Sequence, residues 1–217
     1  MQDKLSEIST QMIERYSERY HDLGYDVRTL GWGSVEQQAY RFQQTLEALQ
    51  SKPEKEILDI GCGFGDYLAT IKASNYAFQK YIGWDLNPDL IQEAQKIWKD
   101  TPNVSFQVKN LNTLPKSESV ADIGVMLGVL NLNLSDKLDN YEYSKKMIST
   151  AFGFVRELLV VDFLSLQYAP NYPKEDFVFY HDPLKMLEFA FELTPNVLLK
   201  HNYAPIPQRE FMLYLYK

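Results

Sequence analysis

The segment ILDIGCGFGDY, residues 57–67, joins a short apolar run to three closely spaced glycines. The run before Gly61 is rich in β-branched and apolar residues, which is typical of a buried strand. The segment after Gly65 has the apolar spacing of a helix. A strand, a tight turn and a helix in direct succession indicate the opening unit of an α/β sheet, so this segment constrains the fold more than any other.

Strand-like and helical runs keep alternating along the rest of the chain. Strands are expected over 55–60, 80–85, 104–108, 122–127, 157–165, 196–203 and 209–217. Helices are expected over 64–74, 88–99, 139–154 and 182–193. The last two strands are joined only by APIPQ, which is too short for a helical crossover, so they should pair antiparallel. We therefore predict a doubly wound, mostly parallel seven-stranded α/β sheet that ends in an antiparallel hairpin.

Residues 1–50 precede the first strand and exceed what a minimal βαβ unit needs. Ser34 and Gln37 are placed to form a capping box for a helix over 35–49. The segment 15–33 mixes aromatic side chains with charges and glycines, which fits either a lid or a fixed cover over one end of the sheet. We divide the chain into an N-terminal helical cap or lid, residues 1–50, and a main domain, residues 51–217, which together form one structural unit.

The acidic composition limits the range of partners. The chain has 217 residues with 22 Lys and Arg against 29 Asp and Glu, a net charge of −7. No global positive field would attract a phosphate backbone, so nucleic acid is not expected as a partner. The sequence shows no apolar segment of signal-peptide or membrane-spanning type, so we expect a cytoplasmic monomer or homodimer without membrane contact. The single cysteine, Cys62, can form neither an internal disulfide nor a cysteine-based metal site, and no metal is expected.

The charges around the glycine loop argue against a dinucleotide. A dinucleotide fingerprint places its third glycine at the position that Asp66 occupies here. A carboxylate at that helix start would repel a bound phosphate, and Asp59 adds a second negative charge just before the turn. The loop therefore suits a ligand that approaches the backbone closely yet carries positive charge. S-adenosyl-L-methionine (SAM) meets this description, with a sulfonium and an ammonium at one end and an adenosine at the other.

With these residues the chain resembles the class I (Rossmann-like) SAM-dependent methyltransferases over residues 55–217. The stretch DIGCGFG matches the first motif of that family, which contacts the methionine part of SAM; its matching residues are Asp59, Gly61, Gly63 and Gly65. The resemblance also implies that Asp85, at the end of the second strand, holds the ribose hydroxyls and that Leu86 packs on the adenine. The product cofactor would be S-adenosyl-L-homocysteine (SAH).

Three further places extend the resemblance. Asn110 and Leu111 follow the third strand, where family members contact the adenine edge. The stretch MLGVLN, residues 126–131, matches the fourth motif beside the methyl group, which implies a cofactor contact from Leu127 and a substrate contact from Asn131. Arg41 lies where several relatives hold the cofactor carboxylate with an arginine, although a surface charge on an amphipathic helix is an equal alternative.

Methyl transfer is an in-line displacement, so much of the catalysis can come from positioning. A general base is required only for an acceptor that arrives protonated; the candidates are His21, Asp162, Tyr180, His181 and His201. His181 lies where the family forms its substrate wall and is the predicted catalytic residue, with a structural role as the alternative. Tyr16, Trp32 and Tyr180 are predicted to line the substrate pocket with Asn131. With 15 Tyr and 12 Phe in the chain, we expect an aromatic pocket for a small-molecule acceptor.

Three rival methyltransferase classes are disfavoured. The chain has GVLN where adenine-N6 enzymes carry an Asn/Asp-Pro-Pro-aromatic turn, and its only cysteine lies in the glycine loop rather than at the nucleophile position of cytosine-C5 enzymes. The acidic set of metal-dependent catechol-type enzymes cannot be assembled around Asp162 alone. Two alternatives to a methyltransferase remain: a non-catalytic SAM-binding partner or regulatory module, and a SAM-using enzyme with chemistry other than methyl transfer.

Overall fold

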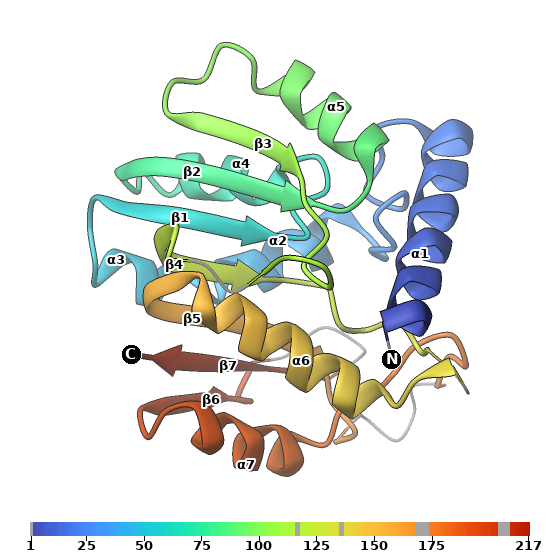
Figure 1. Ribbon diagram of the computed structural model, residues 1–217. Helices are drawn as coiled ribbons and strands as arrows, with labels where there is room; N and C mark the ends of the chain where they lie inside the picture. Colours follow the sequence, from blue (N-terminus) through green and yellow to red (C-terminus); the bar gives the residue numbers. More distant parts are fainter. Residues whose placement is uncertain (1, 116–117, 135–136, 168–173, 204–208) are drawn as a thin grey trace. The chain divides into compact units, whose positions relative to one another are not determined.

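The computed structural model describes residues 2–115, 118–134, 137–167, 174–203 and 209–217. The chain divides into two compact units, Met1–Pro115 and Lys116–Lys217. Its seven strands follow the order β3-β2-β1-β4-β5-β7-β6 in a mostly parallel sheet that ends in antiparallel strands and is flanked by helices (Figure 1). The predicted fold class is thereby confirmed. The division at residue 50 stays a prediction, because residues 1–50 lie within the first compact unit.

The first unit carries three parallel strands. Its elements are α1 (Gln2–Leu23), α2 (Val35–Gln43), α3 (Leu46–Gln50), β1 (Lys55–Ile60), α4 (Asp66–Ala73), β2 (Phe78–Asp85), α5 (Pro88–Ile97) and β3 (Val104–Val108). The central strand β2 pairs Trp84 with Ile60 of β1 and Asp85 with Val108 of β3. The carboxyl ends of the three strands are therefore in register, and their arrows point toward α1 in Figure 1.

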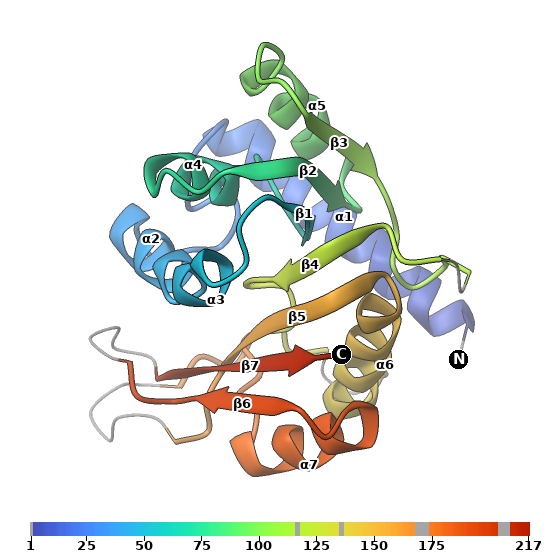
Figure 2. The same ribbon diagram turned by 90° about the vertical axis from the view of Figure 1, so that its left-hand side faces the viewer.

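The second unit carries the antiparallel end of the sheet. Its elements are β4 (Ala121–Met126), α6 (Asn140–Gly153), β5 (Val155–Leu164), α7 (Pro183–Leu193), β6 (Val197–Lys200) and β7 (Glu210–Tyr216). Strand β4 is parallel to β5, whereas β7 runs antiparallel to both β5 and β6, as the opposed arrows in Figure 2 show. The predicted hairpin connection, residues 204–208, lies outside the described residues.

Helices α5 and α7 each begin at a side chain that caps the helix. The Asn87 side chain accepts hydrogen bonds from the backbone N–H groups of Asp89 and Leu90, and Pro88 occupies the first turn of α5. Asp182 caps α7 in the same way, again with a proline in the first turn. These side chains satisfy backbone donors that have no partner within the helix.

The single helix predicted over 35–49 is wrong, because it breaks between α2 and α3. Ser34 does cap α2, accepting from the backbone N–H of Gln37 at 3.2 Å. The buried Thr45, however, donates its hydroxyl to the carbonyl of Phe42 at 2.8 Å and lies 2.7 Å from the Tyr67 hydroxyl. A side chain that bonds the backbone locally competes with regular helical pairing, so the chain turns here before α3 begins.

Gly83 in β2 provides a test of the packing behind the glycine loop. A Cβ added at Gly83 would lie 2.4 Å from Cδ1 of Phe106 and 2.9 Å from Sγ of Cys62. We expect Gly83→Ala to lower the free energy of unfolding by about 1–3 kcal/mol, the usual cost of overfilling a core. The control is Gly153→Ala, because a Cβ there meets no heavy atom within 4 Å. Urea unfolding measures both, and equal effects of the two variants would contradict the packing described here.

Candidate cofactor site

Three positions in the loop between β1 and α4 favour a residue without a side chain. Gly61, Gly63 and Gly65 have φ angles of 75°, 52° and 80°, in the left-handed region that favours glycine. A Cβ on Gly65 would also lie 2.6 Å from Nε1 of Trp98 and 2.7 Å from Cζ of Phe106. The spacing of the glycines is therefore explained both by the left-handed backbone and by the lack of room for a side chain.

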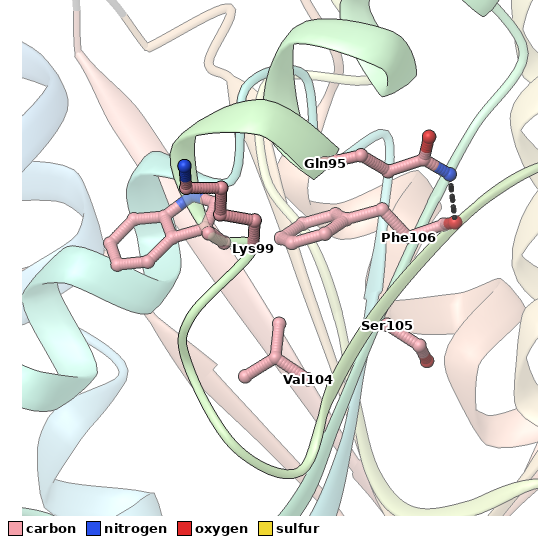
Figure 3. A pocket seen from close by; sticks show the side chains of 6 residues that line it. Gln95, Lys99, Val104, Ser105 and Phe106 are labelled. Carbon is pink, nitrogen blue, oxygen red and sulfur yellow. Dashed lines mark hydrogen bonds between the residues drawn. The ribbon is translucent and has the colours of Figure 1, made fainter.

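The side chains behind the loop also line an open pocket of about 260 Å³ on the β3 side of the unit; they are Gln95, Trp98, Lys99, Val104, Ser105 and Phe106. Figure 3 shows Gln95 beside Phe106, whose backbone carbonyl accepts a hydrogen bond from the Gln95 side-chain amide at 3.0 Å. Trp98 Nε1 donates to the carbonyl of Phe64 at 2.9 Å. These contacts hold α5 and β3 against the loop.

Asp85 lies at the end of β2 with both carboxylate oxygens engaged by the backbone. Oδ2 accepts from the N–H of Gly63 at 3.0 Å, and Oδ1 accepts from the N–H of Asn87 at 2.9 Å. Burial raises the pKa of this carboxyl, whereas hydrogen bonds from the N–H groups of Asn87, Gly63 and Leu86 lower it. A carboxylate offers about four acceptor positions, so both oxygens retain capacity for hydroxyl donors.

Asp59 is the most perturbed acid of the site. It is buried in β1, and its Oδ2 accepts a hydrogen bond from the hydroxyl of the buried Tyr81. The pKa of Asp59 is raised to about 7: burial is the largest cause, the charges of Asp85 and Asp66 act in the same direction, and the Tyr81 hydrogen bond opposes them. The charges of two neighbouring carboxyl groups thus act on Asp59, an arrangement that a positively charged ligand would relieve.

Asp66 begins α4 and is held by the N-terminal segment. Its Oδ1 accepts from the Tyr25 hydroxyl at 2.8 Å, and its Oδ2 accepts from the side-chain amide of Gln38 at 3.1 Å. The ring of Tyr25 packs edge-on against Phe64, with 5.0 Å between the ring centroids. The sequence did not indicate these partners, because each joins segments far apart in the chain.

Of the N-terminal candidates, Arg41 and Trp32 lie together. Arg41 is buried, and its guanidinium carbon lies 4.3 Å from the centroid of the Trp32 ring, a cation–π contact. Tyr16 is on α1, where burial raises the pKa of its hydroxyl and the charge of Asp85 acts in the same direction. Their predicted contacts with cofactor and substrate stay predictions.

The adenine candidates follow β3 and β2. Asn110 donates its side-chain amide to Oγ of Ser9 at 3.0 Å, and its Oδ1 accepts from the backbone N–H of Asn112 at 3.0 Å. Both ends of this amide are thus engaged within the protein. Leu111 is buried and Leu86 is half-buried. Their contacts with adenine stay predictions.

The second unit holds the remaining candidates, and its fourth-motif residues are tied to β5. The N–H of Gly128 donates to Oδ1 of the buried Asp162 at 2.6 Å, next to the buried Leu127. Asn131 accepts from the N–H of Leu164 at 3.0 Å through its side-chain oxygen. The substrate contact predicted for Asn131 stays a prediction.

His181 is fully buried in an aromatic cluster. Its Nε2 lies 2.9 Å from Oγ of Ser144, and its ring centroid is 4.8 Å from those of Phe163 and Phe179. Burial lowers the pKa of the imidazole to about 3, so the ring is neutral at physiological pH. The neighbouring Tyr180 is also buried. The catalytic role of His181 stays a prediction, and it would require the ring to become accessible.

The described residues contain no group of three or more His, Cys, Asp or Glu side chains that could hold a metal ion. Within the described part of the chain, no helix is long and apolar enough to span a membrane.

The raised pKa of Asp59 predicts a pH-dependent stability. Between the ordinary value of 3.8 and about 7, the folded state binds more protons at this group than the unfolded chain. This stabilising contribution is complete below the ordinary pKa and is lost as pH rises through about 7. Asp59→Asn removes the ionisation but keeps an acceptor for Tyr81, so its stability relative to the wild type should rise from pH 5 to pH 8. Urea unfolding at both pH values checks this, with the exposed Asp100→Asn as control; a pH-independent difference would contradict it.

Comparisons with known proteins agree with this geometry. Residues 57–147 match the family described as a methyltransferase domain. The magnesium protoporphyrin IX methyltransferase of Synechocystis PCC 6803, crystallised with bound SAM, has 15% sequence identity and a TM-score of 0.63, covering 99% of this chain and 97% of that chain. The small RNA methyltransferase HEN1 has 18% identity and a TM-score of 0.62, covering 82% and 25%. The [4+2]-cyclase SpnF has 14% identity and a TM-score of 0.64, covering 88% and 73%.

A curated relative, an uncharacterized 37.1 kDa protein in transposon TN4556 of Streptomyces fradiae, is 29% identical over 77 residues. The match spans 36% of this chain and only 22% of that protein. The solved structures, all below 25% identity, establish the fold, and the family match covers the glycine loop and the three strands β2, β3 and β4 that follow it in sequence. Residues 57–147 therefore match a methyltransferase domain, within a fold that the chain shares with SAM-dependent methyltransferases of known structure.

Proposed function

We propose that this methyltransferase transfers the methyl group of SAM to a small-molecule acceptor and releases SAH. The observation that carries the proposal is the acidic cluster at the glycine loop, in which Asp59 and Asp85 are buried and Asp66 begins α4. Such a cluster disfavours a pyrophosphate and favours a ligand with cationic groups. A pKa of about 7 for Asp59 supports the same conclusion, since an adjacent cation would restore its ionised form.

The backbone of the glycine loop, as well as its charge, supports SAM as the ligand. Gly61 is exposed and has a positive φ, so its backbone is open to a close approach. When bound, SAM supplies an electrophilic methyl group on its sulfonium. In this proposal Asp85 accepts the ribose hydroxyls, Arg41 binds the carboxylate, and Asn110 with Leu111 borders the adenine.

The strength of the ribose contact can be bounded. Hydrogen bonds to a charged group contribute about 1.5–3 kcal/mol each, so removing the Asp85 carboxylate should weaken binding at least about tenfold. The two backbone donors of Asp85 hold the carboxylate in one orientation, so no side chain has to be ordered when the cofactor binds. Positioning of this kind is the main contribution to catalysis that we assign to the chain.

A small-molecule acceptor is the finer part of the proposal. The chain has a net charge of −7, which opposes binding of a polyanion, and its many aromatic residues suit an apolar pocket. The similar structures include enzymes named for a porphyrin, for RNA and for a cyclisation, so the fold alone leaves the acceptor open. We therefore rest the proposal on charge and composition.

Methyl-labelled SAM tests the acceptor class. The protein is incubated with a metabolite extract, with total RNA and with labelled SAM alone, and labelled products are identified by mass spectrometry. We expect label in a small molecule, with Asp85→Ala losing most of it and the exposed Asp100→Ala control retaining it. Label in RNA would overturn the small-molecule proposal. SAM binding without labelled product would favour the regulatory module, and cofactor conversion of another kind would favour different chemistry.

We further propose that residues 24–33 act as the lid, a shorter segment than the sequence alone suggested. Leu30 covers the loop so closely that a Cβ on Gly63 would lie 2.8 Å from its Cδ1. Tyr25 is 58% exposed even though its hydroxyl bonds Asp66. The segment thus lies on the loop through a few contacts that can separate, whereas α1 is joined to α5 by several hydrogen bonds.

Hydrogen exchange of the backbone amides tests whether residues 24–33 act as a lid. Amides of residues 24–33 should exchange quickly in the free protein, because local stability is low where few contacts hold a segment. SAH should slow this exchange, while amides of α1 within 12–23 and of β7 should be protected equally with and without it. Equal protection of 24–33 in both states would make the segment a fixed cover.

A further inference from the structure

One face of α1 is joined to the first turns of α5. Ser17 donates its hydroxyl to Oδ2 of Asp89 at 2.6 Å, and Tyr20 donates to Oε2 of Glu93 at 2.9 Å. Ile13, Ser17 and Tyr20 recur at the three- and four-residue intervals that place side chains on one side of a helix. Figure 1 shows α1 (dark blue) beside the end of α5 that follows β2 in the chain. This face of α1 therefore borders the segment that carries Asp85.

Asn87 is the residue where these contacts meet. It is 1% exposed, and its Oδ1 accepts from the backbone N–H groups of Asp89 at 2.8 Å and Leu90 at 3.1 Å. Its Nδ2 donates to the carbonyl of Ile13 at 3.0 Å and to Oγ of Ser17 at 3.0 Å. One end of the amide thus caps α5, and the other end binds α1.

The backbone of the same residue binds Asp85. The Asn87 N–H donates to Oδ1 of Asp85 at 2.9 Å, while Gly63 holds Oδ2. With its side chain fixed at both ends, Asn87 has little freedom to rotate, so its N–H stays directed at the carboxylate. If the contacts to α1 are lost, Asn87 still caps α5, but the cap alone then holds its N–H toward Asp85.

We propose that Asn87 is a positioning residue that uses α1 as a fixed wall to orient Asp85 toward the ribose. This inference rests on the proposed role of Asp85 in SAM binding. It assigns to the N-terminal helix a function that the α/β unit alone does not provide: the rigidity of the ribose contact. Loss of this positioning should weaken the ribose contact selectively, because only interactions made through the ribose hydroxyls depend on the orientation of Asp85.

The Asn87→Ser variant separates the two ends of the amide. Serine is as good a helix cap as asparagine, but its short side chain cannot reach Ile13 and Ser17. The N–H of Asn87 is then no longer oriented from the α1 side, so we expect SAH to bind about tenfold more weakly. Ser17→Ala removes one of the same contacts from the α1 side and should act in the same direction with a smaller effect. Thr10→Ala is the control, because Thr10 is exposed on α1 and its hydroxyl donates to the carbonyl of Ser6 within the same helix.

The test compares SAH with its 2′-deoxyribose analogue by calorimetry, after melting curves confirm that each variant is folded. In the wild type, SAH should bind more tightly than the analogue. In Asn87→Ser and Ser17→Ala the loss should fall mainly on SAH, so the ratio of the two affinities should shrink, while Thr10→Ala should leave it unchanged.

Equal weakening of both ligands would show that Asn87 has only a structural role and would overturn the inference, as would unchanged binding. A wild-type protein that binds neither ligand would instead refute the proposed function, so the two failures are distinguishable. If Asn87→Ser does not fold, Ser17→Ala decides the matter alone.

Discussion

The carboxylate of Asp85 accepts hydrogen bonds from the backbone of Gly63 on one oxygen and of Asn87 on the other. This pair of contacts joins the glycine loop after β1 to the helix start after β2, and it requires the two strand ends to be in register. The parallel pairing of Ile60 with Trp84 supplies that register. The architecture of the first unit can thus be understood as the framework that holds one buried carboxylate with both oxygens directed by the main chain.

Burying that charge has electrostatic consequences for its neighbours. Asp59 lies on the adjacent strand, and its pKa rises because it is buried near Asp85 and Asp66. The hydroxyl of Tyr81 opposes the shift by donating to Asp59. A site with several carboxyl groups and little solvent is poorly suited to phosphate and well suited to a ligand that carries a sulfonium and an ammonium. The acidic loop and the methyltransferase family match therefore have a common physical explanation.

Local patterns in the sequence predicted much of this arrangement. The strand before Gly61, the cap at Ser34 and the antiparallel end of the sheet were all evident, because each depends on residues close in the chain. The break at Thr45 was missed, since it depends on a hydroxyl bond that propensity does not encode. The partners of the site residues were missed for a related reason: Tyr81 meets Asp59 only through a strand register, and α1 meets Asn87 only through tertiary packing.

The central claim is that the glycine loop selects a cationic adenosine ligand rather than a dinucleotide. Isothermal titration calorimetry of the purified protein with SAM, SAH and NAD, at one pH and salt concentration, tests it most directly. We expect saturable binding of SAM and SAH with no detectable binding of NAD. Binding of NAD without binding of either SAM or SAH would contradict it.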